Sequence, residues 1–281
     1  MTIGDAIVWG ADLLDESDAR VQNSRADATL LLRTVLDIPH AELLAYRERP
    51  LTAVQTEQFN ALIQQRRTGK PIQYITGEQE FFGLNFRITP DVLIPRPETE
   101  HLVEAAIARL QDRPMARIAD VGTGSGVIAV ALAHALPQAE LFALDISAAA
   151  LAIAKQNAAR NKVAARIHFR ESDLLAAVAG ESFDAIVSNP PYVAESERKT
   201  LPKEVRDYEP AQALFAGPTG LEIYPRLIAQ AQPLLTPGGW LLMEIGHGQR
   251  DAVASLLQGW HAVEFLNDLQ SIPRVAAARK V

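Results

Sequence analysis

From about residue 115 onward, short apolar runs alternate with alanine-rich stretches, and this alternation constrains the fold more than any other feature. The runs have the length of buried strands, and the stretches between them have helical spacing. Such an order predicts an α/β fold with a doubly wound, mostly parallel sheet. The predicted strands are "RIADVG", "ELFALDI", "ARIHFRES", "FDAIVSN" and "WLLMEIG", and the helices include "VIAVALAHAL" and "AAALAIAKQNAARN". We expect "TPGGW", residues 236–240, to be a turn before the last of these strands.

The first 75 residues have a different character and predict a small all-α domain. Residues 24–27 and 52–55 both resemble capping boxes, and each precedes a stretch with helical apolar spacing. Gly69 and Pro71 are typical of a helix end. Aromatic and β-branched residues alternate in 80–96, which predicts a β-hairpin or two short strands. We therefore expect a helical domain at 1–75, a β-hairpin linker at 76–100 and the α/β domain at 101–281.

Composition limits the function classes. The net charge is -7, which disfavours bulk nucleic-acid binding because proteins that contact many phosphates are usually basic. There is no cysteine, which excludes disulfides and thiolate nucleophiles and favours a cytoplasmic protein. The acidic N-terminus is unlike a signal peptide, and no apolar run reaches the length of a membrane helix. The histidines have no metal-ligand spacing, so we expect no metal, and we expect a monomer.

The first motif with chemical content is "ADVGTGSGVIA", residues 119–129. Asp120 ends a predicted strand, and a glycine loop leads into a helix. Glycines allow positive φ and let backbone N–H groups approach a ligand closely. The same loop fits the dinucleotide fingerprint G-x-G-x-x-A, so it predicts an adenosine ligand without separating NAD from S-adenosylmethionine. The loop residues that we assign to the cofactor are Asp120, Gly122, Thr123, Gly124, Ser125 and Gly126.

Asp145 ends the next predicted strand, 21 residues after Gly124. A carboxylate at this place can accept hydrogen bonds from both hydroxyls of a ribose. The alternative is that Asp145 only caps the following helix, although Ser147 could do that. We assign Ile146 to the same site, and we expect Asp173 and Leu174, after the third strand, to border the adenine.

The sequence "SNPPYV", residues 188–193, follows the fourth predicted strand. Pro190 and Pro191 lack the N–H that a strand needs, so the strand must end there. In a doubly wound sheet the fourth strand lies beside the first, and Asn189 would then face the glycine loop across the crevice.

These residue types suit methyl transfer to a planar nitrogen, whose lone pair is delocalised. The Asn189 side-chain oxygen and the Pro190 carbonyl can accept from its two N–H bonds, which orients the lone pair toward an electrophile. Tyr192 can stack on the flat group. A sulfonium methyl is a suitable electrophile, whereas a hydride donor would not explain two acceptors aimed at N–H bonds.

The order of "DVGTGSG", "LDIS" and "NPPY" resembles class I S-adenosylmethionine-dependent methyltransferases that act on amino groups. The stretch "PIQYITGEQEFFGLNFRITPDVLIPRPETE", residues 71–100, closely resembles the release-factor glutamine N5-methyltransferases, the PrmC or HemK family. This resemblance implies a Rossmann-like methyltransferase sheet behind a helical substrate-docking domain. It also implies that Gly122 to Gly126, Asp145, Leu174 and Asn189 line the S-adenosyl-L-methionine site, which releases S-adenosyl-L-homocysteine.

The resemblance further implies that Asn189, Pro190, Pro191 and Tyr192 hold the glutamine of the Gly-Gly-Gln motif in class I peptide chain release factors. We consider three alternatives: an RNA or DNA amino-methyltransferase; an NAD-dependent oxidoreductase, which fits the glycine loop but not "NPPY"; and a non-catalytic adenosine-binding module, which would need a broken acceptor pair, whereas this pair is whole. The first would need a basic face and base flipping, which the acidic balance disfavours.

Two segments beside these motifs are less specific. Arg96 and Glu98, in "IPRPETE", are candidate substrate-binding residues, although this stretch could equally be a helix start with proline and acids in its first turn. Residues 197–210 are charged and predict a solvated loop, which by its place after "NPPYV" could close over the substrate.

Overall fold

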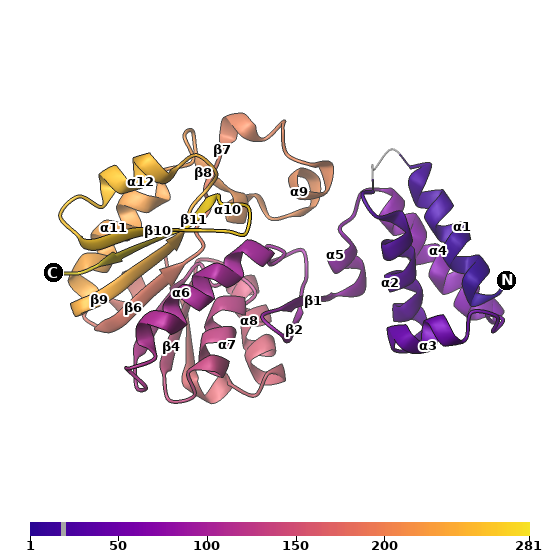
Figure 1. Ribbon diagram of the computed structural model, residues 1–281, viewed down its shortest axis with the longest axis horizontal. Helices are drawn as coiled ribbons and strands as arrows, with labels where there is room; N and C mark the ends of the chain where they lie inside the picture. The colour runs from indigo at the N-terminus through magenta and orange to yellow at the C-terminus, as the bar shows by residue number, and fades with distance from the viewer. Residues whose placement is uncertain (18–20) are drawn as a thin grey trace. The chain divides into compact units, whose positions relative to one another are not determined.

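The computed structural model describes residues 1–17 and 21–281 of the chain (Figure 1). The chain divides into two compact units. A helical unit contains Met1–Gly77 and Leu201–Tyr208, and an α/β unit contains Glu78–Thr200 and Glu209–Val281. Within the described residues, none of the helices combines the length and the apolar character needed to cross a bilayer.

The helical unit is built from amphipathic helices around an apolar core. In the first helix, buried residues recur at helical spacing from Ile3 to Leu14. Gly10 lies on this face, where an added Cβ would come within 2.8 Å of the Phe59 ring, so only glycine lets these two helices pack so closely. The helices of this unit are α1 (Ile3–Asp15), α2 (Ser24–Leu36), α3 (His40–Ala45), α4 (Ala53–Arg67), α5 (Ile72–Thr76) and α9 (Lys203–Tyr208).

One predicted helix cap is confirmed and the other is wrong. The Gln55 backbone N–H donates to the Thr52 hydroxyl at 3.2 Å, and the Thr52 N–H donates to the Gln55 side chain at 3.0 Å, so α4 begins with a full capping box. The helix α2 is capped one residue earlier than predicted, because Asn23 accepts from the Ala26 N–H at 3.2 Å. The acid that the predicted box needed, Asp27, is instead bound to a guanidinium.

That guanidinium belongs to Arg66, which is buried and lies 2.7 Å from Asp27 and 3.1 Å from Glu204. The second contact holds α9 in the helical unit, and the Tyr208 hydroxyl adds a 2.8 Å hydrogen bond to the hydroxyl of Thr68. The prediction of a solvated loop over 197–210 is therefore wrong for residues 203–208, since they form a helix that Glu204 and Tyr208 bind to the rest of the helical unit.

The α/β unit begins with the expected hairpin. The strands β1 (Glu78–Phe81) and β2 (Leu84–Arg87) pair antiparallel. Their turn residues, Phe82 and Gly83, both have positive φ, as a tight hairpin turn with the twist of its strands requires. The pairing ends at Arg87, and 88–96 continue without strand structure.

The large sheet has seven strands in the order β10-β11-β9-β6-β3-β4-β5. The pairs among β3, β4, β5, β6 and β9 are parallel, and β11 runs antiparallel to both β9 and β10. The predicted sheet is thus confirmed, and the strand before "NPPY" lies beside the first. Its strands are β3 (Arg117–Val121), β4 (Glu140–Asp145), β5 (Ile167–Glu171), β6 (Phe183–Ser188), β9 (Leu235–Glu244), β10 (His261–Asn267) and β11 (Pro273–Arg279).

Helices and short elements complete this unit. The helices are α6 (Glu100–Leu110), α7 (Val127–Ala135), α8 (Ala148–Arg160), α10 (Ala211–Leu214), α11 (Ile223–Leu234) and α12 (Arg250–Leu256). Single 3₁₀ turns are η1 (Pro97–Thr99), η2 (Ala164–Arg166), η3 (Ala176–Val178) and η4 (Glu195–Glu197), and a separate two-stranded ribbon joins β7 (Val193–Ala194) to β8 (Phe215–Gly217).

The turn predicted at 236–240 lies inside β9. Leu235 pairs with Phe183 and Trp240 pairs with Ala185. Between these two pairs, β9 therefore contains more residues than β6, which is a β-bulge. Gly238, with a φ of +73°, allows this bulge. The "PGG" sequence bends a strand here and does not interrupt it.

Candidate active site

The carboxyl ends of β3, β4 and β6 meet at one edge of the sheet, where a cavity of about 330 Å³ opens. Ligands of doubly wound sheets bind at this edge, beside the point where the strand order reverses. The predicted residues that line the cavity are Gly122, Gly124, Asp145, Ile146, Asp173, Leu174, Asn189 and Pro191. These residues come from four separate loops, and the parallel sheet brings them together.

The glycine loop between β3 and α7 forms one wall. Gly122, Gly124 and Gly126 all have positive φ, so other residues would be strained there. Gly126 serves packing, because an added Cβ would lie 3.0 Å from the Cβ of Ala154 on α8. Gly122 and Gly124 line the cavity itself, where the missing side chains leave the backbone accessible to a ligand.

Asp120 lies behind this loop and does not line the cavity. It is fully buried, and one carboxylate oxygen accepts from the Thr123 hydroxyl at 2.6 Å and from the Ala129 N–H at 3.1 Å. Burial raises the pKa of Asp120 to about 7. Thr123 and Ser125 belong to the loop, but they are buried and do not line the cavity, so these three predicted residues support the loop from within the protein.

Asp145 ends β4 and faces the cavity. Its carboxylate accepts from the Gly124 N–H at 2.8 Å and from the Ser147 N–H at 2.9 Å. The side chain that caps α8 is that of Ser147, which accepts from the Ala150 N–H at 3.1 Å. Burial raises the pKa of Asp145, and the backbone donors oppose this shift. The carboxylate therefore fixes the glycine loop and still borders the space where a ligand would lie.

Apolar and charged groups from the next two loops border the same cavity. Ile146 exposes 61% of its surface there, which is high for a large apolar side chain. Leu174 lines the cavity from a backbone with positive φ. Its neighbour Asp173 pairs with Arg226 at 2.6 Å, so this carboxylate already has a cationic partner.

Asn189 follows β6 and joins a hydrogen-bonded group. Its amide nitrogen donates to the Thr99 hydroxyl at 3.1 Å, and that hydroxyl donates to Glu244 Oε2 at 2.7 Å. The Tyr192 hydroxyl donates to Glu244 Oε1 at 3.3 Å. Burial and the nearby Glu244 carboxyl raise the pKa of the Tyr192 phenol. Pro190 is buried, and neither Pro190 nor Tyr192 lines the cavity.

The two remaining predicted residues lie away from the cavity lining. Arg96 is 2.5 Å from Glu209, a buried acid that also accepts from the Ile94 N–H. This pair joins the segment before α6 to the segment before α10. Glu98 lies near enough to Glu244 to raise the pKa of that carboxyl.

Sequence reasoning missed several residues of the site. Residues 91–93 and Pro210, Gln212, Ala213, Phe215, Ile223 and Arg226 also line the cavity. None of these belongs to a compact motif, so no local signal marks them. Thr99 and Glu244 had a weak signal, since one lies inside "IPRPETE" and the other ends a predicted parallel strand.

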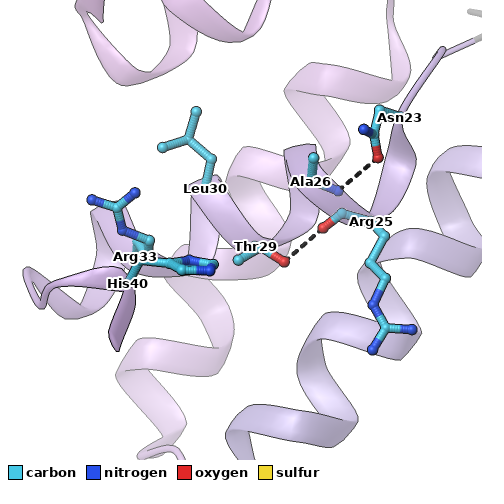
Figure 2. A pocket seen from close by; sticks show the side chains of 7 residues that line it. All are labelled: Asn23, Arg25, Ala26, Thr29, Leu30, Arg33 and His40. Atoms are coloured by element: carbon cyan, nitrogen blue, oxygen red, sulfur yellow. Dashed lines mark hydrogen bonds between the residues drawn. The ribbon is translucent and has the colours of Figure 1, made fainter. Parts of the chain in front are cut away.

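A second cavity, of about 500 Å³, lies on the helical unit. Figure 2 shows Arg25 at one end and Arg33 with His40 at the other, and its remaining lining residues are Asn23, Ala26, Thr29 and Leu30. No predicted site residue lines it. Among residues 1–17 and 21–281, no group of three or more His, Cys, Asp or Glu could hold a metal ion.

Two family models match this chain. Residues 5–77 match the PrmC N-terminal domain, and residues 100–205 match the methyltransferase small domain. A release factor glutamine methyltransferase of Koribacter versatilis is 44% identical over 281 residues, which cover 100% of this chain and 99% of the relative. A relative of the same name from Escherichia coli is 41% identical over 273 residues, covering 96% and 97%.

Solved structures support the fold. The T. thermophilus 16S rRNA N2 methyltransferase RsmC, in complex with AdoMet and guanosine, gives a TM-score of 0.53. Its identity is 20% over 73% of this chain and 50% of that chain, so this likeness shows the fold alone. The predicted Rossmann-like methyltransferase sheet is confirmed.

Proposed function

This chain belongs to the release factor glutamine methyltransferase family, and from that premise we propose the reaction that it catalyses. It transfers a methyl group from S-adenosylmethionine to the side-chain amide nitrogen, N5, of the glutamine in the Gly-Gly-Gln motif of class I peptide chain release factors. The observation that carries the proposal is the place of Asn189. It lies at the end of β6, beside the glycine loop of β3, with its amide nitrogen bound to Thr99.

The cavity residues fit the cofactor. The backbone at Gly122 and Gly124 is open to a ligand, and Asp145, which lines the cavity beside this loop, offers carboxylate oxygens to the hydroxyls of a ribose. Ile146 and Leu174 supply apolar surface for the adenine. When bound, S-adenosylmethionine supplies a methyl carbon activated by a sulfonium, and S-adenosylhomocysteine is the product.

The chain itself orients the nucleophile. Because the amide nitrogen of Asn189 donates to Thr99, its side-chain oxygen points away from Thr99 and can accept from the substrate. The Pro190 carbonyl is a second acceptor, held rigidly by the two proline rings. Two acceptors on the two N–H bonds of the glutamine amide turn its lone pair toward the methyl carbon.

An RNA or DNA amino-methyltransferase is the second candidate, because "NPPY" also suits an exocyclic base amine. The net charge of -7 disfavours it. Mass spectrometry of purified release factor after incubation with the enzyme and S-adenosylmethionine tests the proposal. We expect the mass of one methyl group on the Gly-Gly-Gln glutamine, and an unmodified release factor beside a methylated RNA would contradict it.

We further propose that the helical unit docks the release factor. A tripeptide offers little surface, whereas specific protein recognition usually buries about 800 Å² on each partner. The cavity in Figure 2 is a concave place on this unit, and its Arg25 and Arg33 allow a test by charge reversal.

In that test, Arg25→Glu with Arg33→Glu should slow methylation of whole release factor and leave slow methylation of a Gly-Gly-Gln peptide unchanged. Charge reversal of Arg47 and Arg49, which are exposed on the same unit, is the matched control. Equal loss on protein and peptide would contradict docking at this cavity. A cytoplasmic location stays a prediction from the absence of cysteine, the lack of direct nucleic-acid binding stays a prediction from the acidic charge, and the monomeric state stays a prediction.

A further inference from the structure

We propose that Glu244, acting through Thr99, is the positioning residue that holds the Asn189 carboxamide with its oxygen toward the substrate nitrogen. The inference rests on the proposed amide methylation, since it concerns how the acceptor for that amide is set. It also assigns a role to Thr99 in "IPRPETE", a residue that does not line the cavity.

The geometry is a short relay between three separate parts of the sheet edge. Glu244 ends β9, Thr99 lies in η1, and Asn189 follows β6. The Thr99 hydroxyl is 2.7 Å from Glu244 Oε2 and 3.1 Å from the Asn189 amide nitrogen. Thr99 exposes only 3% of its surface and Glu244 only 1%, so water does not compete for these bonds.

Donor and acceptor rules give the relay one direction. An ionised carboxylate can only accept, so the single proton of the Thr99 hydroxyl is committed to Glu244. The Thr99 oxygen is then left to accept, and the group of Asn189 that can donate to it is the amide NH₂. The carboxamide oxygen must consequently lie on the opposite side, where the substrate N–H bonds need an acceptor.

A protonated Glu244 would permit the reverse order. Its O–H could donate to Thr99, and the Thr99 hydroxyl could donate to the carboxamide oxygen of a flipped Asn189. The flipped side chain would present N–H groups to the N–H groups of the substrate, which repel each other. The relay therefore fixes the Asn189 carboxamide in one orientation only when Glu244 is ionised, although Glu244 lies outside the cavity lining.

The surroundings of Glu244 place its titration in an accessible range. Burial raises its pKa to about 7, and the charge of Glu98 on η1 acts in the same direction. Hydrogen bonds from Thr99 and Tyr192 and the positive charge of Arg274 on β11 oppose the rise. Activity limited by this relay should increase as the pH rises through about 7.

The second oxygen of Glu244 accepts from the Tyr192 hydroxyl, so the same carboxylate holds both polar side chains of "NPPY". Both oxygens thus have donors, and neither belongs to the cavity lining. This arrangement excludes Glu244 as the group that directly receives a proton from the substrate amide.

The test compares wild type with Glu244→Gln, Thr99→Val and Thr99→Ser, and uses Glu264→Gln as the control at an exposed acid on the same sheet. We expect Glu244→Gln and Thr99→Val to lower kcat on release factor at least about tenfold. The dissociation constant for S-adenosylmethionine should change less than about twofold, because neither side chain lines the cavity. Thr99→Ser keeps the hydroxyl and should retain most activity.

The pH profile separates positioning from simple structural support. Wild type and Glu264→Gln should gain kcat as the pH rises through about 7, whereas Glu244→Gln should show no such step. Wild-type kcat in Glu244→Gln with an unchanged profile, or full activity in Thr99→Val, would overturn the inference. If wild type leaves release factor unmethylated, the proposed function fails instead, and the next measurement still tests the relay.

That measurement is an NMR titration of the free enzyme. The side-chain NH₂ signals of Asn189, assigned by their loss in Asn189→Ala, should shift with a midpoint near pH 7 in wild type. They should not shift in Glu244→Gln. Identical titration of these signals in both proteins would show that Glu244 does not control the Asn189 carboxamide.

Discussion

The carboxylate of Glu244 should make the protein less stable at high pH, and Glu244→Gln should remove this effect. The folded-state pKa is about 7 against an ordinary value of 4.5. For a carboxyl with a raised pKa, the folded state binds more protons than the unfolded state between these values. The contribution of Glu244 to stability is therefore greatest below pH 4.5, and it is lost as the pH rises through the folded-state pKa of about 7.

The magnitude follows from the shift. At about 1.4 kcal/mol for each pKa unit, the full effect on the free energy of unfolding is about 3 kcal/mol, most of which develops between about pH 5 and 8. Glutamine has the same shape but no charge: its oxygen can accept from Tyr192 while its NH₂ donates to the Thr99 oxygen, so both groups find partners although the direction of the relay is lost. The variant should thus gain about 2–3 kcal/mol over wild type between pH 5 and pH 8.

Urea unfolding at several pH values, followed by far-UV circular dichroism and by tryptophan fluorescence, measures this difference. The contributions of the other titrating groups to the free energy of unfolding, Asp120 included, cancel when the variant is compared with wild type at the same pH. A stability difference that stays constant from pH 5 to 8 would refute the reasoning, because it would show that Glu244 titrates alike in the folded and unfolded chain.

Three further predictions concern the cavity. Asp145→Ala should weaken S-adenosylmethionine binding roughly tenfold to a hundredfold in calorimetry, because about 1.5–3 kcal/mol of charged hydrogen bonding is lost; unchanged affinity would mean that Asp145 only supports the loop. Asn189→Ala should lower kcat by about 10²-fold with a smaller effect on cofactor binding, and near-normal turnover would contradict the acceptor role. Gly126→Ala should destabilise the protein by about 1–3 kcal/mol in urea unfolding, because its Cβ would press on Ala154 at positive φ; an unchanged midpoint would mean that α8 can shift.

Much of the site could be predicted because its signals are local. A glycine loop after a strand, an acid at the end of the next strand and two prolines after the fourth each follow from the backbone rules of a few neighbouring residues. The handedness of parallel connections then places "NPPY" beside the glycine loop. The sheet order confirms this placement.

Other features depended on contacts between residues far apart in the chain. Thr99 is 145 positions from Glu244 and 90 from Asn189, so no sequence window contains the relay. The same reason applies to α9, where Glu204 pairs with the buried Arg66, and to the start of α2, where Arg66 binds the acid that the predicted capping box required.

The sequence by itself therefore determined the alternation of strands and helices in the α/β unit, the ligand edge of the sheet and several of the residues that line the cavity there. Only the tertiary structure decided which buried polar groups satisfy one another behind that edge. The physical reason is that steric and periodic preferences act within a few residues, whereas a buried carboxylate accepts whichever donors the packing of distant segments brings within about 3 Å.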